Sequence, residues 1–234
     1  MTREGSFGVV LAAGGAGLRF GKKKQFLEIL GRPVLFYSLD AFASLEDVVE
    51  LALVVPREDV GQAARIVGEW SGRDDWQVRI VCGGDRRQDS VRSGLECFWD
   101  SVDCALVHDA ARPLVRVGDV ARLMEAIRLH GAGALGHPAS DSIKKERDGR
   151  VVGSLNRKDI WQVQTPQGAA CDLFKRAYAA VDAATEMTDE AALLAAIDAE
   201  VRLVEGSEEN VKLTRPGDEE LAEFLLGRRA KVKE

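Results

Sequence analysis

A loop of small residues followed by a run of cations is the part of the sequence whose chemistry is easiest to interpret. Residues 11–26 read LAAGGAGLRFGKKKQF, in which Arg19 and the three lysines of 22–24 follow glycines and alanines. Small residues let backbone N–H groups approach an anion closely. The loop follows an apolar run rich in valine, so in an open α/β sheet it lies at the carboxyl edge, where ligands bind. The pattern predicts a phosphate-binding loop in which Arg19 and Lys24 face the ligand.

Two familiar phosphate-binding motifs do not fit this loop. A P-loop, G-x-x-x-x-G-K-[ST], fails at its first and last positions when it is aligned on Gly21-Lys22. A dinucleotide fingerprint, G-x-G-x-x-G, lacks its third glycine after Gly15-Ala16-Gly17. A dinucleotide-dependent oxidoreductase is therefore disfavoured.

The segment CGGDRRQDSV (82–91) repeats the arrangement of a strand, a glycine pair and a helix. Gly84 exposes backbone donors and acceptors, and Ser90 could hydrogen-bond a base or cap the helix. For Asp85 and Asp89 we favour helix capping. Taken alone, this segment is weak evidence for a nucleotide site.

The segment LVHDAARP (106–113) ends a buried strand on His108-Asp109. A carboxylate at this position, beside a phosphate loop, suits a Mg²⁺ ion that bridges to phosphate oxygens. Arg112 could bind a phosphate or pair with an acid. We expect His108 to have a hydrogen-bonded structural role, and no Ser/His/Asp relay is evident.

Three more residues cannot be assigned from their chemistry alone. Arg157 and Lys212 are cations on stretches that resemble strands, and a solvated charge is as good an interpretation as a functional one. Thr188 precedes two acids and an apolar run, which predicts an ordinary helix N-cap.

Strand-like and helix-like segments alternate along the chain, which predicts an α/β fold of the Rossmann-like type. Such alternation implies a mostly parallel central sheet with helices on both faces. The expected strands are 7–13, 49–55, 76–82, 104–108 and 201–206, and a short apolar stretch covers 133–138. The expected helices are 32–44 (starting with Pro33), 58–70, 88–99, 117–130, 170–184 and one that starts at Thr188.

One segment interrupts the alternation. Residues 141–157 contain two extended stretches around Asp148-Gly149, a dipeptide that favours a tight hairpin because both residues accept positive φ. We expect a β-hairpin arm over 140–160 that projects from a single domain spanning 1–234. Because an isolated hairpin is marginal in water, its apolar residues need a cover. That cover is either its own domain or a second copy of the chain.

The composition bounds the class of protein. Of 234 residues, 46% are hydrophobic and 30% are charged, which suits a globular chain with a real core. The net charge of −6 argues against nucleic acid or an anionic membrane as a partner. The four cysteines are scattered, so reduced thiols in the cytoplasm are expected. The first apolar run is too short for a signal peptide, and no stretch approaches the ~18 residues of a membrane span.

The motifs together resemble those of the 2-C-methyl-D-erythritol 4-phosphate cytidylyltransferase family of the non-mevalonate isoprenoid pathway. The resemblance runs from Val9 to about Leu225. It is carried by AAGGAGLRFGKKKQF, GGDRRQDSV, VHDAARP, DSIKK, WQVQTPQ, TDEA and VEGSEENVKLTRP. Two departures are a glycine loop one residue longer than usual and Lys23 in a position often held by proline. Both departures lie in the segment that contains Arg19 and Lys24.

This resemblance implies a role for each matching residue. CTP would contact Ala12, Ala13, Gly14, Gly15, Gly17, Gly84, Asp85, Ser90 and Asp109, and Asp109 would bind Mg²⁺ or another divalent cation. Arg19 and Lys24 match the residues that stabilise the transition state. Arg157 and Lys212 match those that position the acceptor, a small sugar-alcohol phosphate. Its other expected contacts are Arg112, Ser142, which stands where threonine is common, and Thr188.

The resemblance also implies an activity and an assembly. A phosphate oxygen of methylerythritol phosphate would attack the α-phosphorus of CTP in line with pyrophosphate, without a covalent intermediate. Family members pair through exchanged arms, which favours a homodimer. Two alternatives remain at this stage: a cytidylyltransferase for ribitol 5-phosphate or another sugar phosphate, and a nucleotide-binding module without catalysis.

Overall fold

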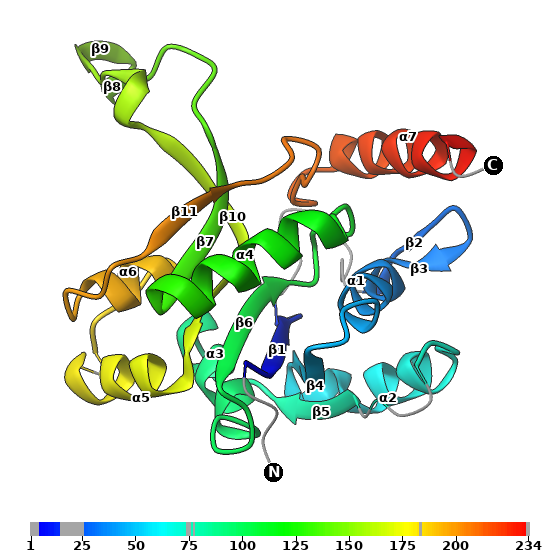
Figure 1. Ribbon diagram of the computed structural model, residues 1–234. Helices are drawn as coiled ribbons and strands as arrows, with labels where there is room; N and C mark the ends of the chain where they lie inside the picture. The colour runs from blue at the N-terminus through cyan, green and yellow to red at the C-terminus, as the bar shows by residue number, and fades with distance from the viewer. Residues whose placement is uncertain (1–4, 15–25, 74–75, 77, 183, 233–234) are drawn as a thin grey trace.

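A twisted, mostly parallel sheet forms the centre of the molecule (Figure 1). The structure, a computed structural model, describes residues 5–14, 26–73, 76, 78–182 and 184–232. Over these residues the sheet has seven strands in the order β11-β7-β10-β6-β1-β4-β5. Strand β10 is antiparallel to both of its neighbours, and the other paired strands are parallel. The strands are β1 (Phe7–Ala12), β4 (Val48–Val55), β5 (Val78–Cys82), β6 (Cys104–Asp109), β7 (Ala132–Pro138), β10 (Trp161–Ala170) and β11 (Arg202–Glu205).

Helices cover both faces of the sheet, as the alternation predicts. Successive strand residues point to opposite faces, so Val9 and Leu11 of β1 join one hydrophobic cluster and Val10 joins the other. The first cluster includes residues of α1 (Val34–Ala43), α2 (Val60–Gly68) and α4 (Val117–His130). The second includes residues of α3 (Arg87–Glu96), α5 (Cys171–Ala180) and α6 (Glu190–Ala195). The predicted Rossmann-like α/β fold is confirmed.

Several predicted element boundaries are wrong. The helix expected over 32–44 begins only at Val34, because Arg32 and Pro33 form the short strand β3, which pairs with β2 (Glu28–Ile29). The helix expected from Thr188 begins at Glu190, because the Asp189 side chain accepts a hydrogen bond from the Ala192 N–H and caps it. The helix expected over 170–184 ends at Ala180. Strand β10 was not predicted at all.

The predicted hairpin arm projects from the carboxyl edge of the sheet (Figure 1). Strands β8 (Lys144–Arg147) and β9 (Arg150–Ser154) pair antiparallel, and Asp148 and Gly149 both have positive φ. Val151 and Val152 are 68% and 57% exposed, so their apolar surface is uncovered in a single chain.

The last helix, α7 (Gly217–Val232), packs beside β2 and closes a third, smaller hydrophobic cluster. In this cluster Ala222 and Leu225 of α7 pack with Ile29 and Leu213. Leu213 directly follows Lys212, so this packing fixes the backbone that carries the lysine. Among the described residues, no helix is both long and apolar enough to cross a membrane.

Candidate active site

The carboxyl edge of the sheet brings the predicted nucleotide-binding segments together. Ala12 lies beside Asp109 in the register of β1 and β6, and the Ala13 N–H donates to a backbone carbonyl of β4 at 2.8 Å. A Cβ atom added to Gly14 would lie 3.8 Å from Ser90 Oγ, so the two glycine-containing loops adjoin. Four further predicted site residues lie outside the described residues: Gly15, Gly17, Arg19 and Lys24.

Ser90 fixes the backbone of the second loop. The Gly84 N–H donates to Ser90 Oγ at 3.2 Å, and the hydroxyl lies 3.3 Å from the Gly84 carbonyl oxygen. A side chain at Gly83 would not fit, because its Cβ would lie 2.6 Å from Ser90 Oγ. The loop conformation therefore depends on this serine and these glycines together.

Arg86 holds the N-cap position of α3, so the capping interpretation is wrong for Asp85. Asp89, in the first turn of α3, accepts a hydrogen bond from the backbone of Arg86, as a capping acid does. Asp89 also forms an ion pair with the Arg86 side chain, with 2.7 Å between Asp89 Oδ1 and Arg86 Nη2. Asp85 is exposed next to Gly84, where the nucleotide is expected.

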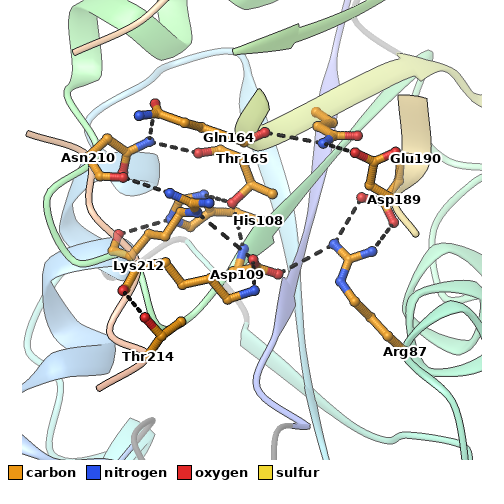
Figure 2. Close-up of polar contacts among 12 residues, drawn as sticks. Arg87, His108, Asp109, Gln164, Thr165, Asp189, Glu190, Asn210, Lys212 and Thr214 are labelled. Atoms are coloured by element: carbon orange, nitrogen blue, oxygen red, sulfur yellow. Dashed lines mark hydrogen bonds and ion pairs between the residues drawn. The ribbon is translucent and has the colours of Figure 1, made fainter. Parts of the chain in front are cut away.

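Three cations surround Asp109 at the end of β6 (Figure 2). Its Oδ2 atom lies 2.6 Å from Lys212 Nζ and 3.9 Å from Arg112 Nε, and its Oδ1 atom lies 3.4 Å from Arg87 Nη2. Burial favours the neutral acid, but these positive charges outweigh it and lower the pKa of Asp109 to about 2. Asp109 is therefore ionised at neutral pH.

A second buried carboxylate belongs to the same cluster. Glu190 accepts hydrogen bonds from both terminal nitrogens of Arg87, at 2.7 and 3.0 Å. Among the residues that the structure describes, Arg87, Arg112 and Lys212 contact the two carboxylates of Asp109 and Glu190, so these positive charges outnumber the two negative ones. Such an excess suits a site for phosphate groups.

His108 is committed to a hydrogen-bond chain and is fully buried. The Asp109 N–H donates to Thr165 Oγ1 at 3.0 Å, and Thr165 Oγ1 lies 3.1 Å from His108 Nδ1. The Arg112 carbonyl, 3.1 Å from Nε2, can only accept, so Nε2 carries the ring proton and Nδ1 accepts from Thr165. Burial lowers the pKa of His108 to about 4. The expected structural role of this histidine is confirmed.

Asn210 anchors the segment that carries Lys212. Its Nδ2 atom donates to Gln164 Oε1 at 3.1 Å and to the Thr165 carbonyl at 2.9 Å. The backbone carbonyl of Asn210 accepts from Arg112 Nη1 at 2.7 Å. Asn210 thus holds Arg112 through its backbone and the segment of Lys212 through its side-chain amide. Lys212 lies in a segment without strand structure, contrary to the strand expected there.

Thr188 lies one residue before the N-cap of α6 and is exposed. Gln167 of β10 holds this helix start, because its Nε2 donates to Asp189 Oδ2 at 3.2 Å and its Oε1 accepts from the Ala191 N–H at 2.7 Å. Thr188 is therefore exposed, and the residues that follow it, Asp189 to Ala191, are held in place by Gln167.

The arm carries Ser142 and Arg157, and both are exposed. Arg157 lies in a 3-10 turn, η3 (Arg157–Asp159), and not in the expected strand, and it donates to the Ser140 carbonyl at 2.8 Å. Within the described part of the chain, the ion pairs of Asp109 are with Arg87, Arg112 and Lys212, and none is with Arg157.

Sequence reasoning missed several members of the site, namely Arg87, Gln164, Thr165, Gln167, Glu190 and Asn210. Arg87 and Glu190 are 103 residues apart in the sequence, so nothing local indicates that they pair. The polar residues of β10 occur in WQVQTPQ, one of the motifs that carry the family resemblance, and that motif was the only available signal.

The described residues contain no group of three or more His, Cys, Asp or Glu side chains that could hold a metal ion by themselves. Asp109 supplies a single ionised carboxylate. This fits Mg²⁺, which is commonly held by one or two carboxylates together with substrate phosphates.

Comparison with known proteins identifies the family. The family model described as 2-C-methyl-D-erythritol 4-phosphate cytidylyltransferase matches residues 7–228. A relative of that name from Acidobacterium capsulatum is 41% identical over 95% of this chain and 98% of its own length. A bifunctional enzyme IspD/IspF from an Anaeromyxobacter species is 40% identical over 97% of this chain but only 58% of its own length.

Solved structures agree with the sequence comparisons. The 4-diphosphocytidyl-2C-methyl-D-erythritol synthase from Anaerococcus prevotii superposes with a TM-score of 0.82 at 26% identity and covers 96% of this chain and 97% of its own. The 2-C-methyl-D-erythritol 4-phosphate cytidylyltransferase from Thermus thermophilus has a TM-score of 0.75 at 33% identity, over 94% and 98% of the two chains. The chain therefore belongs to the 2-C-methyl-D-erythritol 4-phosphate cytidylyltransferase family.

Proposed function

We propose how this chain performs the reaction of its family. The chain is a nucleotidyltransferase that transfers the cytidylyl group of CTP to 2-C-methyl-D-erythritol 4-phosphate, giving 4-diphosphocytidyl-2-C-methyl-D-erythritol and pyrophosphate. The observation that supports the site assignment is the convergence of Lys212, Arg112 and Arg87 on Asp109, beside the loops at Gly14 and Ser90.

The nucleotide and the acceptor would occupy the two sides of this cluster. The backbone of residues 12–17 meets the triphosphate, and Gly84, Asp85 and Ser90 contact the base. Arg112 and Lys212 contact Oδ2 of Asp109, whereas Arg87, which follows the Gly84 loop, contacts Oδ1. We assign Arg112 and Lys212 to the acceptor phosphate. Thr188 adds a hydroxyl, and Ser142 and Arg157 reach the acceptor from an arm.

The chemical step needs charge stabilisation more than proton transfer. An oxygen of the acceptor phosphate forms a bond to the α-phosphorus as the bond to the pyrophosphate oxygen breaks in line with it. Attacker and target are both anionic, so cations must offset their repulsion, and we assign this to Arg19 and Lys24. An ionised phosphate needs no general base, which agrees with the buried and hydrogen-bonded state of His108.

A Mg²⁺ ion, or another divalent cation, would be held by Asp109 and by phosphate oxygens of CTP. When bound, it would add positive charge beside the triphosphate. Asp109→Asn should keep the fold, because an amide oxygen can still accept from Lys212, but it should lose Mg²⁺-dependent activity. The measurement is turnover against Mg²⁺ concentration, with circular dichroism as the control for folding. Full wild-type activity in excess chelator would remove the metal from the mechanism.

A substrate panel tests the function directly. Pyrophosphate release is measured with CTP, UTP and ATP, each combined with methylerythritol phosphate, ribitol 5-phosphate or glycerol 3-phosphate. We expect release with CTP and methylerythritol phosphate to exceed every other pair by at least about tenfold, since sites that hydrogen-bond a substrate strongly reject analogues that leave those groups unpaired. Comparable release with ribitol 5-phosphate would favour the other sugar-phosphate reading.

We further propose that residues 1–234 form one nucleotidyltransferase domain that works as a cytoplasmic homodimer. The uncovered apolar side chains of the arm support the dimer. Four free cysteines, two of them buried, suit a reducing compartment. The net charge of −6 disfavours nucleic acid and anionic membranes as partners.

A further inference from the structure

Arg87 joins three elements of the fold through one side chain (Figure 2). It lies in the first turn of α3 and donates through Nη1 and Nη2 to the two carboxylate oxygens of Glu190, in the first turn of α6. Its Nη2 atom also lies 3.4 Å from Oδ1 of Asp109, at the end of β6. Arg87 is 103 residues from Glu190 in the sequence and 22 residues from Asp109.

The elements that Arg87 joins belong to different halves of the active site. Helix α3 follows the loop of Gly84, on the nucleotide side. Helix α6 follows Thr188, on the acceptor side. Gln88, the next residue of α3, supports the same connection: its side chain accepts from the Met187 N–H at 2.8 Å and donates to the Thr185 carbonyl at 2.9 Å.

The chemistry of this contact requires arginine. Glu190 is only 2% exposed, and burial raises its pKa even though the charge of Arg87 opposes that shift. A guanidinium fork matches both carboxylate oxygens and still leaves an N–H for Asp109, whereas a lysine ammonium is a point charge on a flexible stem. A neutral residue at position 87 would leave a buried carboxylate without its counter-ion.

We propose that Arg87 is a positioning residue that holds Asp109 and the Thr188 segment in one geometry, and so sets the acceptor side of the site relative to the nucleotide side. The proposal rests on the roles given above to Asp109 and Thr188. Arg87 itself is assigned no contact with either substrate. The Gly84 loop has its own anchor in Ser90, so loss of the Arg87 contacts should affect the acceptor more than CTP.

Arg87→Lys tests the proposal, because it keeps the charge and removes the fork. We expect kcat/KM for methylerythritol phosphate to fall about 10- to 100-fold, since small misplacements of substrate-positioning groups have effects of this size. The Kd of CTP, measured by calorimetry, should stay within about twofold of the wild type. Arg92→Lys is the matched control: Arg92 lies on the same helix, in an exposed ion pair with Glu96, and its change should leave both constants as they are.

Glu190→Gln provides a second route to the same answer. It should reproduce the acceptor defect, and the double variant should be no worse than the more impaired single variant, because the two residues act as one unit. If Arg87→Lys does not fold, Glu190→Gln carries the test alone. Fully additive losses, or a lower melting temperature with unchanged acceptor kinetics, would overturn the proposal and leave Arg87 a purely structural brace.

Hydrogen exchange separates this proposal from the proposed function. Amide exchange in the peptide 184–195 should become faster in Arg87→Lys and stay unchanged in Arg92→Lys, whether or not the chain accepts methylerythritol phosphate. Failure of the wild type in the substrate panel would reject the function. Unchanged exchange in Arg87→Lys would reject the positioning role.

Discussion

At the scale of single residues, the charge balance around Asp109 decides what each substitution should do. Lys212, Arg112 and Arg87 are already in contact with carboxylates before any substrate is present. An incoming acceptor phosphate would therefore have to share Lys212 and Arg112 with Asp109. We assign the charge that develops only during the reaction to two other cations, Arg19 and Lys24 of the sequence that follows β1.

Lys24→Ala and Arg19→Ala should lower turnover much more than they weaken CTP binding. Their proposed task is to stabilise charge that exists only in the transition state, so their loss should appear in kcat. Removing one such donor typically costs ~10²–10³-fold in rate. Lys22→Ala is the control, because Lys22 or Lys23 is expected to be solvated.

The two constants to compare are kcat from pyrophosphate release and the Kd of CTP from calorimetry. Near-normal turnover in both variants would reject the assignment. If Arg19→Ala alone kept a normal kcat, the extra residue in the glycine loop would have shifted the alignment. Arg19 would then not correspond to the family's cation that stabilises the transition state.

His108 should make the folded chain less stable as the pH falls from about 6.5 to about 4. Burial lowers the pKa of His108 in the folded state. Between these pH values the unfolded chain therefore binds a proton that the folded chain does not, and this lowers the free energy of unfolding. The groups that face the ring are Asp109, Arg112 and Thr165. A difference between the ordinary pKa of 6.5 and one of about 4 is worth up to about 3 kcal/mol.

His108→Gln is the informative variant, because an amide can donate to the Arg112 carbonyl and accept from Thr165 as the neutral imidazole does. Urea unfolding at several pH values should give a flatter dependence on pH for the variant between 6.5 and 4. An equal slope in both proteins would show that carboxylates alone produce the acid sensitivity.

The parts of the site that the sequence predicts are those with local signals. Asp109 follows a buried strand and Gly84 follows another, so both fall at the carboxyl edge of the sheet by topology alone. Glu190 and Asn210 give no such signal, because an acid at a helix start and an asparagine in a polar loop are common at the surface. Only the tertiary fold, which brings Arg87 and Gln164 to them, turns these residues into buried members of the site.

At the scale of elements, the close approach of α3 to the sheet is the feature that substitution can test. Gly94 lies on the buried side of α3, and a Cβ atom there would lie 2.7 Å from Val10 Cγ1 and 2.8 Å from Val54 Cγ2. Both valines are fully buried, so neither can move away freely. Gly94→Ala should therefore destabilise the fold by about 1–3 kcal/mol, the usual range for overpacking.

Gly227→Ala on α7 is the matched control, because no atom lies within 4 Å of the Cβ position there. In a helix interior that change should stabilise by about 0.5–1 kcal/mol. Urea midpoints of the two variants should move in opposite directions. A shift of the Gly94→Ala midpoint in the same direction as the control would contradict the close packing.

Helix α4 and strand β10 show why some elements are predictable and others are not. Helix α4 matches the predicted range 117–130, since its apolar residues recur at helical spacing and Gly131 ends it with φ of 86°. Strand β10 contains Gln, Pro and Gly, which local propensity disfavours in strands or leaves neutral. Its hydrogen bonds with β6 and β7, made across long sequence separations, decide its structure.

At the scale of the whole molecule, the arm is the feature that bears on assembly, since it projects away from the sheet (Figure 1). A two-stranded hairpin is marginally stable alone in water, and this one exposes Val151 and Val152. The arm also carries Ser142 and Arg157, which are assigned to the acceptor but do not join the cluster around Asp109 in their own chain. A partner chain that receives the arm would solve both problems.

We therefore expect the wild-type chain to sediment as a homodimer at micromolar concentration. Replacing Val151 and Val152 together by serine should shift the equilibrium toward monomer, because it removes the apolar surface that the partner would cover. Leu129→Ser on α4 is the control: this leucine is 69% exposed but lies outside the arm, so its loss should leave the dimer intact. The monomeric variant should retain CTP binding, whose residues lie in the body of one chain, and should use the acceptor poorly. A wild-type chain that sediments as a monomer would contradict the dimer, and Ser142 and Arg157 would then have to act within their own chain.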